Sequence, residues 1–431
     1  MLLIFTQKAT PRLTYVFKHI FTRILGIKID FTSTIEVFVA HSGAKMSYGK
    51  QPMGNELFFQ SEGLLVQQGI ESVDVNVKAW EDTSCFFTVS SRSALPYDIF
   101  AASFYLLSRY EEYLPHVKDE LSRYPASESI GHKHAFLHQP VIDIWAHKLK
   151  SVLQEAFPLM VFPEKKLEIH SVIEASQPYA FSQKGLFRNV LGYVSELVNF
   201  RIRSVLKRSK VIFRLQKDPY NTFNWIIAAT KASTSKVTIF FMLGDALVFS
   251  EGLSQHRKKF RSLMKYVSDY KELGLLFSPN ALHEYETLKT EKKQLEEITN
   301  RTLLSTMNDQ FLVHLPDVPR HLVELEVQRD FTMVYRNAIG FRAGTCTPFL
   351  FYDLDFEIKT PLEIHPIAAA TKAMNNMEET AIEEAVNLLY NEVNRVKGTF
   401  TMRFSNRDFA DGPQGRMWRR IFSEKLHKNE S

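Results

Sequence analysis

The sequence contains only two cysteines, Cys85 and Cys346, among its 431 residues. Two thiols cannot form a disulfide framework, and their spacing matches no metal-binding motif. We therefore expect two buried thiols, because unpaired cysteine is among the most buried residue types. The scarcity of cysteine fits a reducing compartment, so the chain is expected in the cytoplasm.

Long hydrophobic runs are also missing. No segment reaches the ~18 uncharged apolar residues that a membrane-spanning helix needs. The apolar start at residues 2–5 is shorter than the ~7-residue core of a signal peptide, and no basic region precedes it. We expect a strand there. Glycine and proline number only 17 each, which leaves little room for flexible linkers.

Charge is close to balanced, with a formal net charge of +5. That excess is too small to support nucleic-acid binding, so no nucleic-acid partner is expected. The apolar content is high, at 45%, and includes 34 phenylalanines. A chain of this length and composition can bury a large core and is expected to hold two domains.

The first 160 residues mix strand and helix patterns. A helical repeat of apolar residues over 12–25 is closed by Gly26. Further runs predict strands at 35–40 and 57–60, and helices at 96–113 and 142–157. We therefore expect residues 1–160 to form an N-terminal mixed α/β domain of unknown function.

After Pro163 the pattern changes, because short apolar strands alternate with longer helical stretches. Strands are predicted at 167–173, 237–243, 273–277, 310–315, 332–334 and 399–404. Helices are predicted at 257–270, 284–302, 320–326 and 378–396. This alternation is typical of a β/α-repeating layer or barrel. We expect a second domain over 161–424, followed by a polar tail over 425–431.

One stretch of this second part carries a specific motif. Residues 340–349 read GFRAGTCTPF, and residues 351–354 read FYDL. The stretch resembles the arginine motif of polysaccharide deacetylases. Five other stretches strengthen the resemblance: NELFFQS at 55–61, SALPYDIFAASFY at 93–105, SRYEEY at 108–113, KDPY at 217–220 and FFMLGD at 240–245.

The whole chain thus resembles a bacterial family in which an uncharacterised N-terminal α/β domain precedes a polysaccharide deacetylase-like barrel. That barrel belongs to the carbohydrate esterase family four superfamily. The resemblance implies an α/β fold class, with a distorted (β/α) barrel as the second domain. It also implies a hydrolase fold that acts on carbon–nitrogen (amide) bonds.

Active members of the superfamily hold a divalent metal on one aspartate and two histidines, with a second aspartate as base and a further histidine as acid. The metal polarises the amide carbonyl and lowers the pKa of its water, while the acid protonates the leaving amine. The aspartate pair matches Glu174 and Ser176 here, and the histidine positions match Leu276, Gln310 and Ser405. Because leucine cannot coordinate zinc and a serine hydroxyl replaces a carboxylate poorly, the resemblance implies lost metal positions at Ser176, Leu276, Gln310 and Ser405.

Three other positions of the family's site are retained: Asp245, Arg342 and His365. With Glu174 and Ser176 they form the candidate cleft residues, and none of them is assigned a catalytic role. Glu174 and Ser176 could bind a polar ligand, but polar residues at a strand end also serve as turn caps.

Arg342 has two interpretations as well. It suits a carboxylate or carbonyl partner in a cleft, or an internal salt bridge with Asp245, Glu174 or Asp353. The remaining histidines that invite a metal assignment match no zinc motif by spacing, and surface or core roles are expected for them: His256, His283, His314 and His321.

A basic stretch at 185–217 stands apart from these motifs. Apolar residues alternate there with many arginines and lysines at helical spacing. Amphipathic helices with basic faces could rest on an anionic membrane surface or bind an acidic glycan. They could equally be a solvated face beside the mouth of the cleft.

Three functions remain open from the sequence, and it leaves undecided whether the protein is an enzyme. The first is a pseudoenzyme that has lost metal-dependent hydrolysis and binds a carbohydrate-type ligand or a protein partner, with no cofactor. The second is an active deacetylase of N-acetylated sugars with a rebuilt site that uses Glu174 and His365 and a zinc-like divalent metal. The third is an assembly factor in surface-polysaccharide production, recognised through the basic helices and the N-terminal domain.

Overall fold

The computed structural model describes residues 1–182, 186–244, 253–254 and 258–426. The chain divides into two compact units, each assembled from separate stretches. Unit 1 comprises Met1–Glu168, Phe311–Ala369 and Glu384–Thr401. Unit 2 comprises Ile169–Gln310, Ala370–Glu383 and Met402–Ser431.

A parallel four-stranded sheet opens unit 1. Its strands follow the order β2-β1-β3-β4. Their bounds are β1 Leu2–Phe5, β2 Ile29–Thr32, β3 Lys45–Gly49 and β4 Leu57–Gln60. Every residue of β1 is buried, as expected for a central parallel strand. The strands predicted at the N-terminus and at 57–60 are confirmed.

The helix predicted at 12–25 is also confirmed, as α1 Pro11–Phe17 followed by the π-helical η1 Lys18–Ile24. The hydroxyl of Thr10 caps α1 by accepting a hydrogen bond from the Leu13 amide at 3.1 Å. Gly26 ends the segment with a φ of +73°, and a Cβ there would lie 2.4 Å from Pro163 Cγ. Only glycine fits this turn.

The strand predicted at 35–40 is wrong, because this segment is helix α2, Ile35–Ala40. The alternating β-branched residues suggested a strand, but Ile35, Val37 and Val39 are all exposed. Only Phe38 is buried, and its ring packs on Phe5 with 5.5 Å between the centroids. A single buried side chain per turn suits a short helix better than a two-faced strand.

The helix predicted at 96–113 is present but broken. It begins after Asp98, whose carboxylate caps α3 Ile99–Leu107 by accepting from the Ala101 amide at 3.0 Å. Arg109 then adopts a left-handed conformation with φ of 54°, and α4 follows over Tyr110–Tyr113. The helix predicted at 142–157 is confirmed as α6, Val141–Ala156.

Aromatic packing explains much of the phenylalanine content. In unit 1, Phe17 stacks on Phe100 with 4.1 Å between ring centroids, and Phe21 and Tyr48 contact Phe100 as well. The two cysteines are buried free thiols, as predicted. The other elements of unit 1 are η2 Leu64–Val66, β5 Lys78–Trp80, β6 Thr83–Cys85, η3 Ala126–Glu128, α5 Ile130–Lys133, α12 Asp317–Glu324, β13 Arg329–Asp330, β14 Phe349–Asp353 and β15 Ile358–Ile364.

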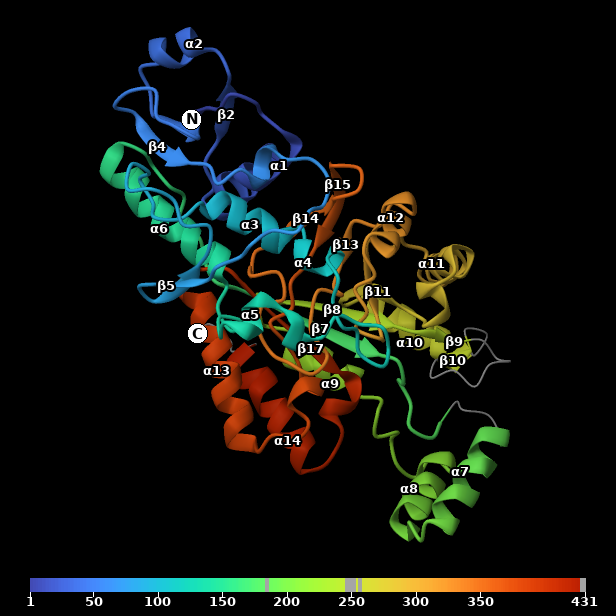
Figure 1. Ribbon diagram of the computed structural model, residues 1–431. Helices are drawn as coiled ribbons and strands as arrows, with labels where there is room; N and C mark the ends of the chain where they lie inside the picture. The colour runs from blue at the N-terminus through green and yellow to red at the C-terminus, as the bar shows by residue number, and fades with distance from the viewer. Residues whose placement is uncertain (183–185, 245–252, 255–257, 427–431) are drawn as a thin grey trace. The chain divides into compact units, whose positions relative to one another are not determined.

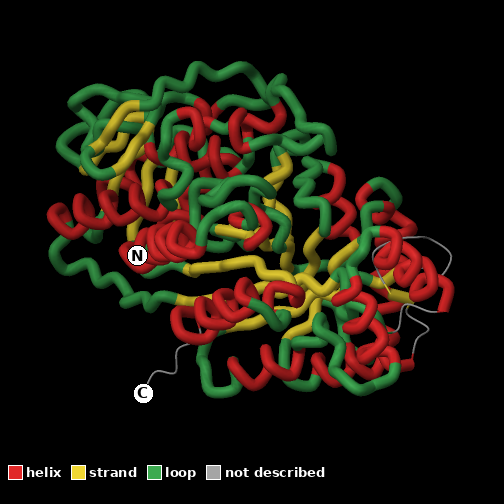
Figure 2. Tube along the Cα trace, turned by 90° about the horizontal axis from the view of Figure 1, so that it is seen from below, coloured by secondary structure: helices red, strands yellow, loops and turns green. Residues whose placement is uncertain are grey.

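Strands alternate with helices along the chain in unit 2 (Figure 1), and Figure 2 shows strands in yellow with helices in red beside them. The strands lie in the order β12-β11-β8-β7-β17. Parallel pairing joins β7 Glu168–Ala175 to β8 Lys236–Phe241, β8 to β11 Glu272–Phe277, and β11 to β12 Ser305–Asn308. The chain reaches β17, Thr399–Ser405, after helix α13, Glu379–Arg395; α13 begins in unit 2 and ends in unit 1, and β17 begins in unit 1 and ends in unit 2. The predicted α/β class with a β/α repeat after Pro163 is confirmed.

The remaining elements of unit 2 complete this pattern. They are α7 Leu186–Val198, α8 Ile202–Ile212, α9 Phe223–Ala229, β9 Leu243–Gly244, β10 Leu253–Ser254, α10 Lys258–Ser268, η4 Asn280–Leu282, α11 Tyr285–Thr299, η5 Thr371–Met374, η6 Asn406–Phe409, α14 Pro413–Arg420 and η7 Ile421–Leu426. The short strand β16, Ala369–Ala370, lies where the chain passes from unit 1 to unit 2. Over the described part of the chain, no helix has both the length and the apolar character to cross a bilayer.

Two strands of the structure lie earlier in the sequence than predicted. The strand predicted at 310–315 is instead β12, Ser305–Asn308, and the one predicted at 332–334 is β13, Arg329–Asp330, three to four residues earlier. The sequence of β12 is STMN, so its buried residues are mostly polar and give no apolar signal. The apolar run that suggested a strand starts at Phe311, which has a left-handed φ of 58°.

Candidate functional site

The parallel strands β7, β8, β11 and β12 of unit 2 end at the same edge of their sheet. In parallel α/β sheets ligands bind beyond this carboxyl edge. Here the edge carries charged and polar side chains from β7, from β17 and from the turn after β17. We call Glu174, Ser176, Arg403, Arg407 and Asp408 the strand-end cluster.

A buried ion pair lies at the centre of the strand-end cluster. Arg403 on β17 donates to Glu174 Oε2 of β7 from Nε at 2.9 Å and also from Nη2. Its Nη1 donates to the carbonyl of Asn308 at 3.0 Å. The side chains are only 1% and 9% exposed. A guanidinium keeps its charge in such surroundings, so a fixed cation sits at the strand ends.

The second oxygen of Glu174 faces another arginine. Arg407 Nη2 lies 3.9 Å from Glu174 Oε1, and Arg407 Nε donates to Ser405 Oγ at 3.2 Å. Arg407 is 37% exposed, so its guanidinium is both held in place and accessible to solvent. The cluster therefore has an inner cation and an outer one.

Asp408 completes the cluster. Its carboxylate accepts hydrogen bonds from Thr371 Oγ1 at 2.6 Å and from the Ser405 amide at 2.7 Å. Burial, and to a lesser degree the negative charge of Glu174, raise the pKa of Asp408 to about 6 although these hydrogen bonds oppose the shift. A carboxyl group with this pKa can exchange a proton near neutral pH.

The predicted metal positions lie at the same strand ends but offer few ligands. Glu174 pairs in register with Phe240, and Phe240 pairs with Gly274, which places Leu276 on the same face as Glu174. Leu276 is fully buried. Ser176 is buried as well, and its hydroxyl has no hydrogen-bond partner among the residues that the structure describes.

The other two predicted positions follow strands β12 and β17. Gln310 lies two residues beyond the end of β12, whose last residue is Asn308. Ser405 is the last residue of β17, and its hydroxyl serves Arg407 as an acceptor. Asp245, the retained aspartate, and His256 lie outside the described residues.

These donors do not fit the metal site that the resemblance implies. A catalytic zinc ion needs three protein ligands, commonly histidine nitrogens and a carboxylate. Glu174 is engaged by a guanidinium, Leu276 carries no donor atom, and the remaining positions hold neutral hydroxyl or amide groups. Within 1–182, 186–244, 253–254 and 258–426, no group of three His, Cys, Asp or Glu side chains is placed to hold an ion.

Arg342 of the arginine motif lies in unit 1 and forms an internal salt bridge, which was one of its two interpretations. Its partner is Glu112 of α4, which was not among the expected carboxylates. Nε and Nη2 donate to the two carboxylate oxygens at 3.0 and 2.7 Å. Arg109 binds the same carboxylate at 2.8 Å. Burial alone would raise the pKa of Glu112, but the two arginines hold it below its usual value.

The rest of the arginine motif binds α6 in the same unit. The carboxylate of Asp143 accepts from Thr345 Oγ1 at 2.6 Å, from the Cys346 amide at 3.1 Å and from Thr347 Oγ1 at 2.6 Å. Gly340 has a φ of +124°, and a Cβ there would lie 2.4 Å from the Leu137 carbonyl oxygen. The motif therefore fastens residues 340–347 to α4 and α6.

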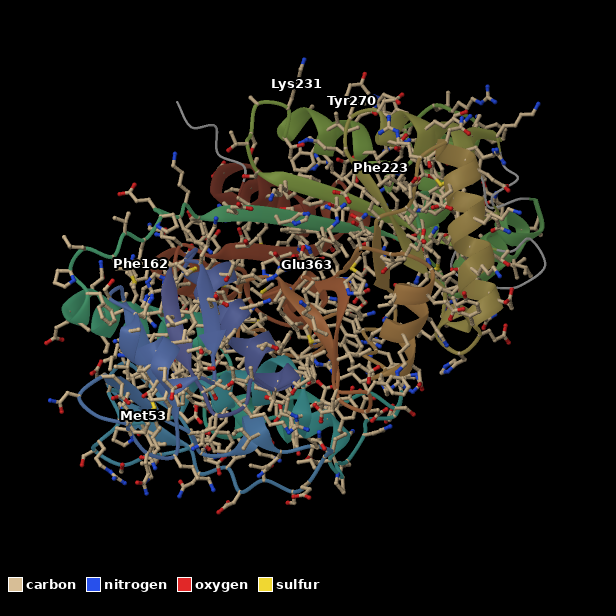
Figure 3. The ribbon with its side chains drawn as sticks, turned by 90° about the horizontal axis from the view of Figure 1, so that it is seen from above. Met53, Phe162, Phe223, Lys231, Tyr270 and Glu363 are labelled. Atoms are coloured by element: carbon tan, nitrogen blue, oxygen red, sulfur yellow. The ribbon has the colours of Figure 1, made fainter. Side chains whose placement is uncertain are left out.

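His365 also belongs to a structural network of unit 1. Its Nε2 lies 3.0 Å from Glu363 Oε2, and its ring stacks on Phe331 with 4.4 Å between centroids. Glu363, labelled in Figure 3, accepts a second contact from Arg23 Nη1 at 2.5 Å. The hydrogen bond from His365, followed by the one from Arg23, lowers the pKa of Glu363 to about 2.

Sequence reasoning missed Arg403, Arg407 and Asp408. The signal that could have identified Arg403 is its position within TFTMRFS, a strand whose other large residues are apolar. A buried charge requires a partner, and Glu174 is one of the two carboxylates of β7, whose sequence is EIHSVIEA. The sequence could therefore have indicated that Arg403 needs a carboxylate partner, but not which carboxylate it binds.

Comparison with known proteins gives partial matches. Residues 2–158 match the model of a family of unknown function, DUF7033. A search of curated proteins returns no match. That family model covers less than half of the chain.

Three solved structures resemble the chain over about three fifths of its length. A protein assigned as a polysaccharide deacetylase from Mycobacterium smegmatis is 10% identical, with a TM-score of 0.38 over 62% of this chain and 86% of that chain. Puue allantoinase is 12% identical, with a TM-score of 0.37 over 62% and 86%. A 4-alpha-glucanotransferase from Thermococcus litoralis is 12% identical, with a TM-score of 0.33 over 61% and 37%. Similarity this slight carries no argument about activity.

Proposed function

We propose that this protein is a non-hydrolytic, deacetylase-like protein that binds a carbohydrate-type ligand at the strand-end cluster of unit 2. The observation that carries the proposal is the buried pair of Glu174 and Arg403, which is completed by the Asn308 carbonyl. A permanent organic cation occupies the carboxylate that would otherwise be offered to a metal ion.

Metal-dependent amide hydrolysis requires a Lewis acid that activates water and a group that protonates the leaving amine. Unlike a metal ion, the guanidinium of Arg403 has no coordination position at which water could bind and be activated. It also does not act as a proton donor, because a guanidinium stays protonated in the physiological range. It would also repel a divalent ion placed beside Glu174. These properties favour loss of hydrolysis over a rebuilt metal site.

The rim of the cluster suits polar recognition. Arg407 presents a partly exposed guanidinium whose planar donors match carboxylate, carbonyl and vicinal hydroxyl oxygens. Asp408 lies one residue further along and can donate or accept a hydrogen bond near neutral pH, because its pKa is about 6. Sugars with N-acetyl or carboxylate groups offer the complementary atoms.

Calorimetric titration with short N-acetylglucosamine and uronic acid oligosaccharides tests this proposal. We expect saturable binding by the natural protein, weakened at least about tenfold by Arg407→Gln, since a charge-assisted hydrogen bond is removed. Arg416→Gln is the matched control, because Arg416 is an exposed arginine on α14 of the same unit. Binding that is absent, or equal in both variants, would refute the proposed site.

A further inference from the structure

Exposed apolar side chains are concentrated on the helical pair α7–α8 of unit 2. We call residues 186–217 the helical hairpin; its two helices lie side by side in Figure 1. Of the 27 large apolar side chains that are exposed among the described residues, 11 fall between Val190 and Leu215. Phe200, in the turn between the helices, is 88% exposed. Exposed apolar surface this concentrated marks an interaction site.

The exposed apolar residues of α7 form one continuous stripe. They recur at the spacing i, i+1, i+4, i+7 and i+8, which defines a single face of a helix: Val190, Leu191, Val194, Leu197 and Val198. The opposite face of α7 carries Asn189, Tyr193 and Glu196, which contact α8. The apolar stripe therefore points away from the partner helix.

Polar contacts hold the hairpin in this arrangement. Arg208 of α8 donates to both carboxylate oxygens of Glu196 at 3.0 and 2.7 Å, and to Asn189 Oδ1 at 3.1 Å. Gly192 makes room for it, because a Cβ there would lie 2.5 Å from the Arg208 guanidinium carbon. A buried arginine paired in this way cannot exchange places with the apolar stripe without leaving a charge unpaired.

A basic stripe runs beside the apolar face of α8. Arg203, Lys207 and Lys210 recur at i, i+4 and i+7, and Arg214 follows shortly after the end of α8 at Ile212. The exposed apolar residues Ile202 and Leu206 lie about a quarter turn away, at 100° per residue, and the exposed Phe213 directly follows the helix. An apolar face bordered by lysine and arginine is the pattern of helices that lie in the plane of a membrane surface.

The hairpin carries almost no negative charge. Between residues 186 and 217 the only acidic residue is Glu196, which Arg208 occupies. A second copy of the hairpin would therefore bring two basic stripes together without an acidic counterpart. A partner with a negatively charged surface and an apolar interior below it would match both the basic stripe and the apolar stripes.

We propose that the helical hairpin binds the surface of an anionic lipid bilayer, with its apolar stripes among the acyl chains and its basic stripe at the headgroups. This proposal is independent of the strand-end cluster. The apolar stripes supply the depth of insertion, and the basic stripe supplies the preference for negative lipids.

Vesicle flotation of the full-length protein tests the proposal. We expect the protein to float with phosphatidylcholine vesicles that contain about one third phosphatidylglycerol, and to remain behind with phosphatidylcholine alone. High salt should release it, because the attraction of the basic stripe is screened. Equal binding to both kinds of vesicle, or to neither, would overturn the proposal.

Two variants separate the stripes. Leu197→Ser with Phe213→Ser removes exposed apolar side chains, and Arg203→Gln with Lys210→Gln and Arg214→Gln removes positive charge. Each should weaken partitioning to the anionic vesicles at least about tenfold. The matched controls are Leu159→Ser with Val161→Ser, which are 96% and 84% exposed elsewhere, and Lys289→Gln with Lys293→Gln on α11. A larger loss of partitioning for the hairpin variants than for the controls supports the proposal. Losses of equal size contradict it.

A direct readout comes from the turn between the helices. Phe200→Trp places an indole at a position where the natural side chain is 88% exposed. Brominated anionic lipids should quench the added tryptophan, since its ring inserts below the headgroups. Absence of quenching, combined with a dimer in light scattering that Leu197→Ser with Phe213→Ser dissolves, would identify a second copy as the occupant.

Discussion

At the scale of single residues, buried arginines organise both units. Arg109 and Arg342 share the carboxylate of Glu112 in unit 1, and Arg403 binds Glu174 in unit 2. A buried charge is tolerated only when it is paired and hydrogen-bonded. Such pairs are sensitive to loss of one partner, because the other is left charged without water.

Glu174→Gln should therefore destabilise the protein strongly. The substitution leaves the guanidinium of Arg403 buried beside a neutral amide, with an expected loss of about 3 kcal/mol in the free energy of unfolding. Urea denaturation followed by tryptophan fluorescence measures it.

The matched comparison is Arg407→Gln, which removes a partly exposed arginine from the same carboxylate and should cost less than about 1 kcal/mol. The double variant Glu174→Leu with Arg403→Met should recover part of the stability, because no charge remains buried. A loss of stability for Glu174→Gln that is as small as the loss for Arg407→Gln would show that the ion pair of Glu174 and Arg403 contributes little.

Gly274 on β11 gives a second prediction at this scale. A Cβ there would lie 2.4 Å from Phe240 Cε1 and 2.9 Å from the Ser305 carbonyl oxygen. Gly274→Ala should therefore lower the free energy of unfolding by about 2 kcal/mol through overpacking, and Phe240→Leu in the same chain should recover part of the loss. Gly49→Ala is the control, because a Cβ at that position would meet no atom within 4 Å. An unchanged free energy of unfolding for Gly274→Ala would mean that the ring of Phe240 can move aside without cost.

At the scale of elements, the sequence predicts regular patterns well and polar strands poorly. The helices at 142–157, 257–270, 284–302 and 378–396 are all present, because their apolar spacing matches the helical period. The strand β12 was missed, since a buried STMN segment satisfies its polar groups by hydrogen bonds that composition does not reveal. Residues 35–40 were misassigned because burial, not propensity, decides between a helix and a strand.

A contact between elements of unit 1 predicts a pH dependence. Glu363 of β15 has a pKa of about 2, below its ordinary value of 4.5, because His365 and Arg23 of η1 bind its carboxylate. The ionised form is favoured in the folded state, so this stabilisation is complete above about pH 4.5 and is lost as the pH falls toward 2.

Glu363→Gln should lower the free energy of unfolding by roughly 1 to 2 kcal/mol at neutral pH, and should flatten its decline below pH 4.5. Urea midpoints measured from pH 7 to pH 3 test both effects. Glu286→Gln is the control, since that side chain is 78% exposed and lies 3.7 Å from Lys289. If the urea midpoints of the natural protein and of Glu363→Gln fell equally between pH 4.5 and pH 3, ionised Glu363 would not contribute to stability.

At the scale of the whole molecule, the candidate site could be predicted only in part. The sequence located the strand ends that carry Glu174, Ser176, Leu276 and Ser405. It could not show that Arg403 binds Glu174, because the two residues lie 229 positions apart. It also left Arg342 open to a role in a cleft, whereas its carboxylate partner is Glu112 of α4.

The most direct test is the metal content of the purified full-length protein, measured by mass spectrometry together with amide hydrolysis of N-acetylglucosamine oligosaccharides. With Arg403 bound to Glu174, we expect less than about a tenth of an equivalent of zinc, cobalt or iron, and no acetate release above background. About one equivalent of a transition metal, removed by a chelator together with deacetylase activity and restored with it, would contradict a site built on this ion pair.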